Sequence, residues 1–270
     1  MVNLFAHGLA DFSHQATIYE KFFGVSFESF NFPDVQDGGF DRKKSSLGQD
    51  GDMAAAREFY GQFDGKLKHK FGLSRGAVTI INCAAEDGAE AEDGTDEEPR
   101  TVETVALTVE SPFADMRHVI ASALETGIGR AARIPGLVGF VHLFLPLIYG
   151  QYKSSGIQPI HVVHKIRKDM PILLICSKQD QLIPWWSTMA LYKRLKETGH
   201  EHVYILVVDR GRHAKILLGP DGDIYVKVFH AFSRRYGLQH DPLLAQEGQE
   251  RLDLCQPDLD TVTSVLPSWC

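Results

Sequence analysis

The chain has 270 residues, of which 44% are hydrophobic and 23% are charged, so it can form a soluble globular domain with a sizeable core. This composition excludes collagen-like, wholly disordered and disulfide-scaffold proteins. The cysteines lie far apart without metal-ligand spacing, which argues against a zinc ribbon: they are Cys83, Cys176, Cys255 and Cys270.

The net charge of −7 comes from one block, in which eight acidic residues fall within residues 86–98. Without them the remaining acids nearly equal the 28 basic residues, so we expect a solvated acidic loop over 86–100. No basic stripe is present, which disfavours nucleic acid as a partner. The N-terminus has no basic start and no signal-length apolar run, and the most apolar stretch, residues 134–150, is broken by glycines and prolines. We therefore expect a cytoplasmic chain without stable membrane insertion.

In chain order, short apolar runs alternate with longer amphipathic ones. The pattern predicts strands over Val2–Ala6, Val25–Phe32, Leu67–Leu73, Val102–Val109, Pro171–Cys176 and Val203–Asp209. It predicts helices over Asp52–Phe63, Gly76–Ala85, Met116–Thr126, Trp186–Thr198 and Ile224–Tyr236. Strands that alternate with helices predict an α/β fold, with a mainly parallel sheet and helices on both faces. We place this domain at residues 1–238 and expect a peripheral tail over 239–270.

A G-x-S-x-G pattern at residues 72–76 falls between a predicted strand and a predicted helix. This pattern suits a sharp turn that presents the Ser74 hydroxyl, with glycines that let helix and strand approach closely. A serine nucleophile needs a base, and the base needs an orienting carboxylate. Asp180 and His213 each follow a later predicted strand, and the carboxyl ends of parallel strands meet at one edge of a sheet. Asp115 is the competing acid, with a helix cap as its alternative role.

These motifs, together with His7-Gly8, Ser111-Pro112-Phe113 and Gly211-Arg212-His213, resemble the α/β-hydrolase superfamily over roughly residues 2–238. The closest resemblance is to its serine esterase, monoglyceride-lipase and serine-peptidase branch. It implies Ser74 as nucleophile, His213 as general base and acid, Asp180 as the orienting acid, and an oxyanion hole from the backbone N–H groups of Arg75 and Leu9. No cofactor is implied. The family's usual first two strands are missing before Val2, so a trimmed sheet is expected.

The resemblance also implies a helical lid insertion over residues 113–169. Its apolar run would wall a substrate pocket, for which we name Phe140 and Phe144, while Trp185 beside Asp180 could contact substrate or pack in the core. His161 and His164 have a spacing that metals use, but no third ligand is near, so a lid-face role is favoured. The Arg75 side chain is expected on the surface at a helix start.

One departure from the family pattern bears on activity more than on fold. The strand that leads to Ser74 carries Lys66, Lys68 and Lys70 on one face, where a central strand should be apolar. From the motifs at Ser74, Asp180 and His213, the sequence predicts a serine hydrolase acting on a small-molecule carboxylic ester, thioester or small amide through an acyl-enzyme. The alternative is an inactive hydrolase-like binding or interaction module. The acyl group, the leaving group and the oligomeric state stay open.

Overall fold

The structure is a computed structural model that describes residues 1–9, 11, 13–36, 39–92, 103–129 and 134–267. Its centre is a six-stranded sheet in the order β2-β1-β5-β6-β7-β8, in which every neighbouring pair is parallel. The strands are β1 Val2–Ala6, β2 Glu28–Ser29, β5 Lys68–Leu73, β6 Thr104–Glu110, β7 Ile172–Ser177 and β8 Val203–Val208. A separate two-stranded ribbon joins β3 Val35–Gln36 to β4 Gly39–Phe40.

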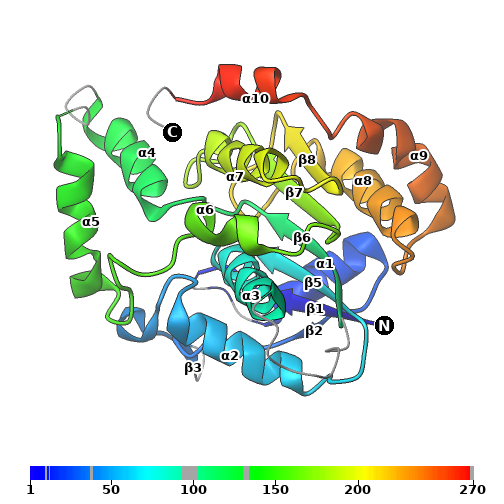
Figure 1. Cartoon of the computed structure of the whole chain (residues 1–270), viewed down its shortest axis with the longest axis horizontal. Coiled ribbons are helices and arrows are strands. Elements are labelled where there is room, and N and C mark those ends of the chain that lie inside the picture. Colours follow the sequence, from blue (N-terminus) through cyan, green and yellow to red (C-terminus); the bar gives the residue numbers. More distant parts are fainter. Residues whose placement is uncertain (10, 12, 37–38, 93–102, 130–133, 268–270) are drawn as a thin grey trace.

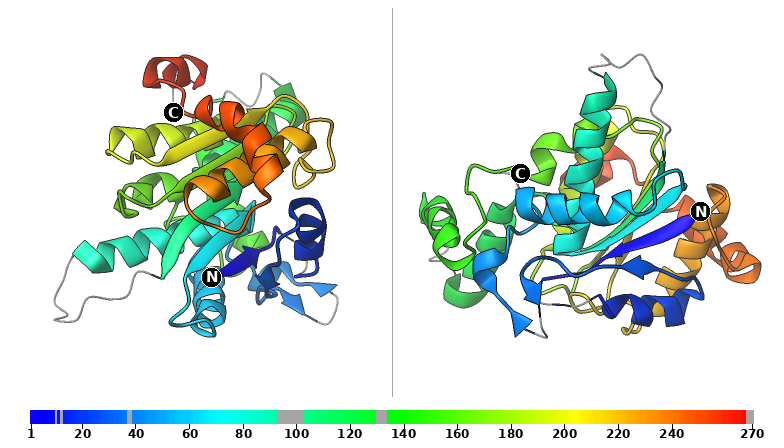
Figure 2. Two further views of the ribbon diagram at one scale, coloured as in Figure 1. Left: turned by 90° about the vertical axis from the view of Figure 1, so that its right-hand side faces the viewer. Right: turned by 90° about the horizontal axis from the view of Figure 1, so that it is seen from below.

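Helices cover both faces of the sheet (Figures 1 and 2). Because successive side chains of a strand point to opposite faces, Leu4 enters one hydrophobic core and Phe5 the other. The first core packs against α2 Asp50–Gly61, α3 Arg75–Glu92 and α7 Trp185–Glu197, whereas the second packs against α1 Gln15–Phe23 and α8 Gly222–Arg235. Burial on both faces is the reason that β7 and β8 are almost wholly apolar, and the predicted α/β class is confirmed.

The segment between β6 and β7 is helical. It contains α4 Met116–Ile128, α5 Leu137–Ile148, α6 Pro159–Val162 and the 3₁₀ turn η3 Val163–Lys165. A third apolar cluster joins Phe113, Met116 and Ile120 to Leu47 and Val78, and the inner face of α5 packs on it. Another 3₁₀ turn, η1 Arg42–Lys44, lies near the C-terminal end of α5, where the Gly150 amide donates to the Arg42 carbonyl (3.3 Å).

Two expected elements differ from the structure, and one observed helix was not predicted. The run Val25–Phe32 was predicted as a strand, but only Glu28–Ser29 pairs with β1, and the helix α1 before it was not predicted. Helix α3 continues to Glu92, so residues 86–92 of the predicted acidic loop are helical; residues 93–100 lie outside the described part. Beyond Ala85 the helix still packs on η3, since a Cβ on Gly88 would lie 2.0 Å from the Lys165 carbonyl oxygen.

The C-terminal residues, expected to be peripheral, form two helices, α9 Pro242–Asp253 and α10 Leu259–Val265. They bury Leu252, Cys255 and Val262 in the two main cores. Residues 268–270, including Cys270, lie outside the described part. Among the described residues, no helix combines the length and the apolar character needed to cross a bilayer.

Candidate active site

Ser74 lies in the turn between β5 and α3, with a backbone φ of +53°. This left-handed conformation is rare for a residue with a Cβ, and the neighbouring glycines make the tight turn possible. A Cβ on Gly76 would lie 2.1 Å from the Ala6 carbonyl oxygen, and one on Gly72 would lie 2.6 Å from Ala77 Cα. The two glycines of the pattern are therefore required by close approach between backbones.

His213 connects Ser74 to Asp180. Its Nε2 lies 2.9 Å from Ser74 Oγ, and its Nδ1 lies 2.7 Å from Asp180 Oδ2. The other carboxylate oxygen of Asp180 accepts hydrogen bonds from the amides of Leu182 and Ile183, both at 2.9 Å. The carboxylate is thus held by two backbone amides, and with Nδ1–H donating to it, Nε2 is free to accept the serine proton. The structure brings together the three residues named from the sequence.

Asp115, the competing acid, does not face His213. It caps the N-terminus of α4 by accepting from the Arg117 amide (2.8 Å), and it pairs with the Arg117 guanidinium (2.9 Å). The arginine partner lowers the pKa of Asp115, although burial acts against this. Its structural role is therefore that of a helix cap.

The backbone expected to form the oxyanion hole lies beside Ser74. A Cβ on Gly8 would lie 3.8 Å from Ser74 Cβ, which places the Gly8–Leu9 backbone next to the serine. Arg75 is the first residue of α3, and amides in the first turn of a helix have no intrahelical acceptor. Asp11, which the sequence analysis did not single out, also lies here; burial raises its pKa, with His213 among the opposing influences.

The side chain of Arg75 was expected on the surface, and this prediction is wrong. Arg75 is 1% exposed; it forms an ion pair with Asp34, and its Nε lies 3.8 Å from Asp52 Oδ2. The guanidinium also lies 4.2 Å from the Phe32 ring centroid, and its Nη2 donates to the Gly8 carbonyl (3.4 Å). Because a buried charge is costly unless it is paired, the two aspartates explain why the arginine can lie inside.

The lysines of β5 are accommodated by acidic and aromatic neighbours. Lys68 and Lys70 are each 4% exposed; Lys68 pairs with Glu103, while the Lys70 ammonium lies 4.5 Å from the Tyr60 ring centroid and 3.7 Å from Asp87. Long apolar stems in the core with paired ammonium groups at its margin let the strand remain central. This departure from the family pattern is thus compatible with a well-formed turn at Ser74.

A buried carboxyl beneath the three residues was missed by the sequence analysis. Glu110 ends β6, its carbonyl accepts from the Ser74 amide (2.8 Å), and its carboxylate accepts from the Tyr19 hydroxyl (2.9 Å). Burial raises the pKa of Glu110 to about 7, against the opposing effects of the hydroxyls of Tyr19 and Tyr225. The sequence signal that could have identified Glu110 is its position, at the end of a mostly apolar strand and directly before Ser111-Pro112-Phe113.

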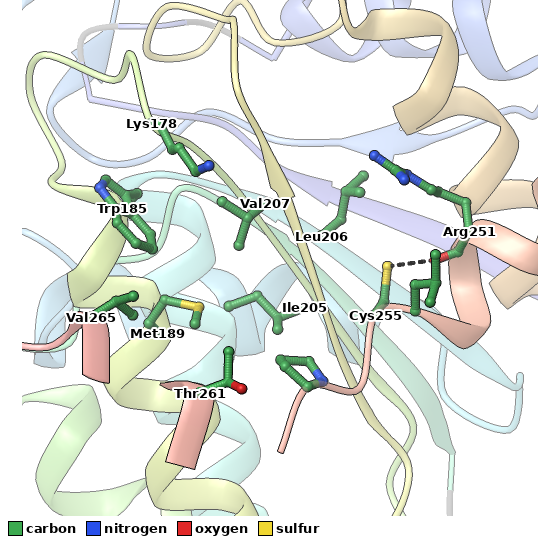
Figure 3. A pocket seen from close by; sticks show the side chains of 12 residues that line it. Lys178, Trp185, Met189, Ile205, Leu206, Val207, Arg251, Cys255, Thr261 and Val265 are labelled. Carbon is green, nitrogen blue, oxygen red and sulfur yellow. Dashed lines mark hydrogen bonds between the residues drawn. The ribbon is translucent and has the colours of Figure 1, made fainter. Parts of the chain in front are cut away.

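The predicted substrate-pocket residues lie on an exposed helix face and in a groove at β8. Phe140 and Phe144 are 59% and 47% exposed, because the inner face of α5 is formed by other side chains. Trp185 lines a separate groove of about 360 Å³ at the edge of β8, together with Met189 and Ile205 (Figure 3). The hollow that does contain His213 is shallow, about 290 Å³, and is lined by Gln181, Leu182, Arg212 and Lys215.

The spacing of His161 and His164 does not produce a metal-ligand cluster within the described residues. His161 belongs to α6 and His164 to η3, so the two follow different helical geometries.

Comparison with solved structures places this arrangement in a known fold. An esterase of Pyrococcus furiosus superposes with a TM-score of 0.57 at 17% identity, covering 87% of this chain and 82% of the esterase. A membrane phospholipase A described as a bacterial virulence factor gives a TM-score of 0.60 at 13% identity, covering 87% and 79%. The chain therefore has the α/β-hydrolase fold. A monoacylglycerol lipase of Paleococcus ferrophilus also shares this α/β-hydrolase fold, with a TM-score of 0.53 at 18% identity, covering 84% and 91%.

Sequence comparison agrees over part of the α/β-hydrolase domain. Residues 149–230 match the prolyl oligopeptidase family (Peptidase_S9), a stretch that includes Asp180 and His213. The uncharacterised protein YqkD of Bacillus subtilis is 34% identical over 145 residues, which cover 53% of this chain and 40% of YqkD. The matched part of the chain thus spans less than half the length of that relative.

Proposed function

We propose that the protein is a serine hydrolase that cleaves a carboxylic ester, thioester or small amide through an acyl-enzyme on Ser74. The observation that carries the proposal is the pair of hydrogen bonds made by His213, to Ser74 Oγ (2.9 Å) and to Asp180 Oδ2 (2.7 Å). A serine hydroxyl is a weak nucleophile unless a base within hydrogen-bond reach takes its proton. The family match over residues 149–230 and the hydrolase fold support the same chemistry.

In the first half of the reaction, Ser74 Oγ attacks the substrate carbonyl carbon while its proton passes to His213 Nε2. The carbonyl oxygen becomes an oxyanion, which the amides of Arg75 and Leu9 would stabilise by hydrogen bonds. Asp180 stabilises the imidazolium that forms. His213 then gives the proton to the leaving alcohol, thiol or amine as the bond to the acyl carbon breaks, and the acyl group stays on Ser74.

In the second half, water replaces the leaving group. His213 Nε2 takes a proton from the water as its oxygen attacks the acyl carbon, and it returns that proton to Ser74 Oγ when the ester bond to the serine breaks. The products are a carboxylic acid and the regenerated serine. Each step uses side chains and amides already described, so the mechanism itself calls for no cofactor.

We further propose that residues 113–169 act as a lid that sets acyl chain-length preference. The support comes from the inner face of α5, where Val138, Val141 and Leu145 pack on the third apolar cluster. This cluster contains Val78, whose amide donates to the Ser74 carbonyl, and Leu9, whose neighbour Gly8 lies beside Ser74. Each substrate methylene buried there would contribute up to about 0.8 kcal/mol. A Val141→Asp variant should therefore flatten the chain-length dependence of kcat/KM while acetate esters still react.

Two measurements test the function. A fluorophosphonate probe should label the wild-type protein and not Ser74→Ala, with the exposed Ser264→Ala as a matched control that still labels. With p-nitrophenyl esters of increasing chain length, Ser74→Ala should lower kcat by a factor on the order of 10⁴ to 10⁶ while the folded structure persists. A wild-type protein that neither labels nor turns over any ester would favour the inactive binding module, and near-normal activity in Ser74→Ala would exclude the mechanism.

A further inference from the structure

Helix α5 exposes most of its large apolar side chains to solvent and buries its polar one. Its sequence, Leu137-Val-Gly-Phe-Val-His-Leu-Phe-Leu-Pro-Leu-Ile148, contains one polar side chain, and that residue, His142, is the one that is buried. The largest apolar side chains point outward, with Leu143 68% and Leu147 67% exposed. A surface helix in water normally has the opposite arrangement, with its apolar stripe toward the core.

This orientation is fixed by contacts on the inner face. His142 Nε2 lies 2.6 Å from the Tyr152 hydroxyl oxygen, and that oxygen accepts from Gln158 Nε2 (3.1 Å). The His142 carbonyl accepts from Ser154 Oγ (2.9 Å). Val138 and Val141 pack on the apolar cluster beside them. Rotation of the helix to hide its leucines would break this network, so the apolar face stays outward.

Exposed apolar side chains are concentrated in and just before α5. Of the 17 exposed large hydrophobic residues among those described, seven fall between residues 128 and 148. They are Ile128, Ile134, Phe140, Leu143, Phe144, Leu147 and Ile148. Helix α5 lies at the outside of the molecule, beyond α4 (Figures 1 and 2). Contiguous apolar patches are uncommon on soluble monomers and mark surfaces that contact another apolar phase.

Basic side chains adjoin the apolar face at the C-terminal end of α5. Arg42, Lys43 and Lys44 of η1 are exposed, and Lys43 Nζ donates to the Leu147 carbonyl at the end of the helix. Lys153 is also exposed and pairs with Asp50 at 2.7 Å, while Asp41 accepts from the Lys43 amide (3.0 Å). These described, exposed side chains comprise four basic and two acidic groups, on a chain whose net charge is −7.

We propose that the outer face of α5, together with η1, docks the protein on anionic phospholipid membranes. The apolar side chains would enter the boundary between headgroups and acyl chains, and the basic side chains would meet the lipid phosphates. A helix of 12 residues is about 18 Å long, well short of the roughly 30 Å of a bilayer core, so it lies along the surface. The docking does not depend on the proposed activity of Ser74.

Vesicle sedimentation tests the proposal with the full chain. Wild-type protein should sediment with vesicles that contain about 30 mol% phosphatidylglycerol in phosphatidylcholine, and much less with phosphatidylcholine alone. Leu143→Asp with Leu147→Asp should lower the partition coefficient by at least about 100-fold. The matched control is Leu243→Asp, on α9 and 72% exposed, which should change binding less than twofold, a difference of about 0.4 kcal/mol.

A second variant isolates the charge contribution. Arg42→Gln with Lys44→Gln should weaken binding to the anionic vesicles by roughly 25-fold, because each basic side chain near such a surface strengthens binding roughly fivefold. Ser74→Ala should bind as the wild type does, whether or not esters are hydrolysed. The proposal is overturned if the wild-type protein binds neither vesicle type, or if the double aspartate variant binds anionic vesicles as well as the wild type does. A solution dimer that the double aspartate variant separates would likewise overturn it, since the face would then join two copies of the chain.

Discussion

Replacement of Arg75 by methionine is expected to destabilise the fold strongly. Methionine keeps much of the length of the side chain but removes the charge that faces two fully buried aspartates, Asp34 and Asp52. It also removes the stacking of the guanidinium over Phe32 at 4.2 Å. The variant therefore leaves two carboxyl groups in the core without their cation.

The size of the effect follows from the cost of unpaired buried charge. Removing one partner of a buried ion pair typically costs about 3–5 kcal/mol. Burial raises the pKa of Asp52, and Arg75 is the largest influence that opposes this, so its loss raises that pKa further. A carboxyl whose folded-state pKa is raised costs stability once the pH exceeds its unfolded pKa of about 3.9, and the destabilisation should therefore be larger at pH 8 than at pH 5.

Urea unfolding at the two pH values measures this directly. A loss of about 3–5 kcal/mol corresponds to a melting temperature roughly 6–20 °C lower for a chain of this size. The triple variant Arg75→Met, Asp34→Asn, Asp52→Asn should recover most of the loss, because it removes the charges together. A single variant within about 1 kcal/mol of wild type at pH 8, or a triple variant no more stable than the single one, would refute this reasoning.

Asp180→Asn should lower kcat for p-nitrophenyl esters by a factor on the order of 10⁴, because the imidazole loses its orienting charge, whereas Asp115→Asn should retain activity within about tenfold; the reverse ranking would contradict the assignment. Glu110 has a folded-state pKa of about 7, above the value of about 4.3 expected when unfolded. Between pH 5 and pH 8, the free energy of unfolding of the wild type should therefore fall by about 2–3 kcal/mol more than that of Glu110→Gln. Parallel pH profiles for the two proteins would speak against a buried titrating carboxyl. Gly76→Ala should lose stability or solubility, since its Cβ would lie 2.1 Å from the Ala6 carbonyl oxygen; an unchanged unfolding midpoint would show that the turn can relax.

The strand-and-helix order was predictable because its pattern is local. The strands that precede Asp180 and His213 are short apolar runs closed by polar turns, and the parallel sheet brings their ends close to the turn at Ser74. Helix α1 was missed although Ala16, Tyr19 and Phe23 follow helical spacing, since it is only nine residues long. Val25–Phe32 alternates as a strand does, but only two of its residues find a partner strand.

Residues that depend on distant partners could not be predicted. Nothing near Arg75 in the sequence shows that Asp34 and Asp52 will surround it, and a lone arginine at a helix start is normally exposed. Phe140 and Phe144 were assigned to a pocket because apolar side chains usually face inward, whereas His142 determines which face of α5 is inside. Long-range polar contacts decided both cases.

The outer edge of β8 is covered by the segment between α9 and α10. The Ile205 amide donates to the Cys255 carbonyl at 2.7 Å, and Gln256 Nε2 donates to the Val203 carbonyl at 3.1 Å. An uncovered edge strand presents unpaired amides and carbonyls to any other extended chain, which makes it a template for aggregation. The C-terminal helices thus protect the sheet against edge-to-edge association, and a shortened protein that stops at residue 238 would form insoluble assemblies even with its central strands intact.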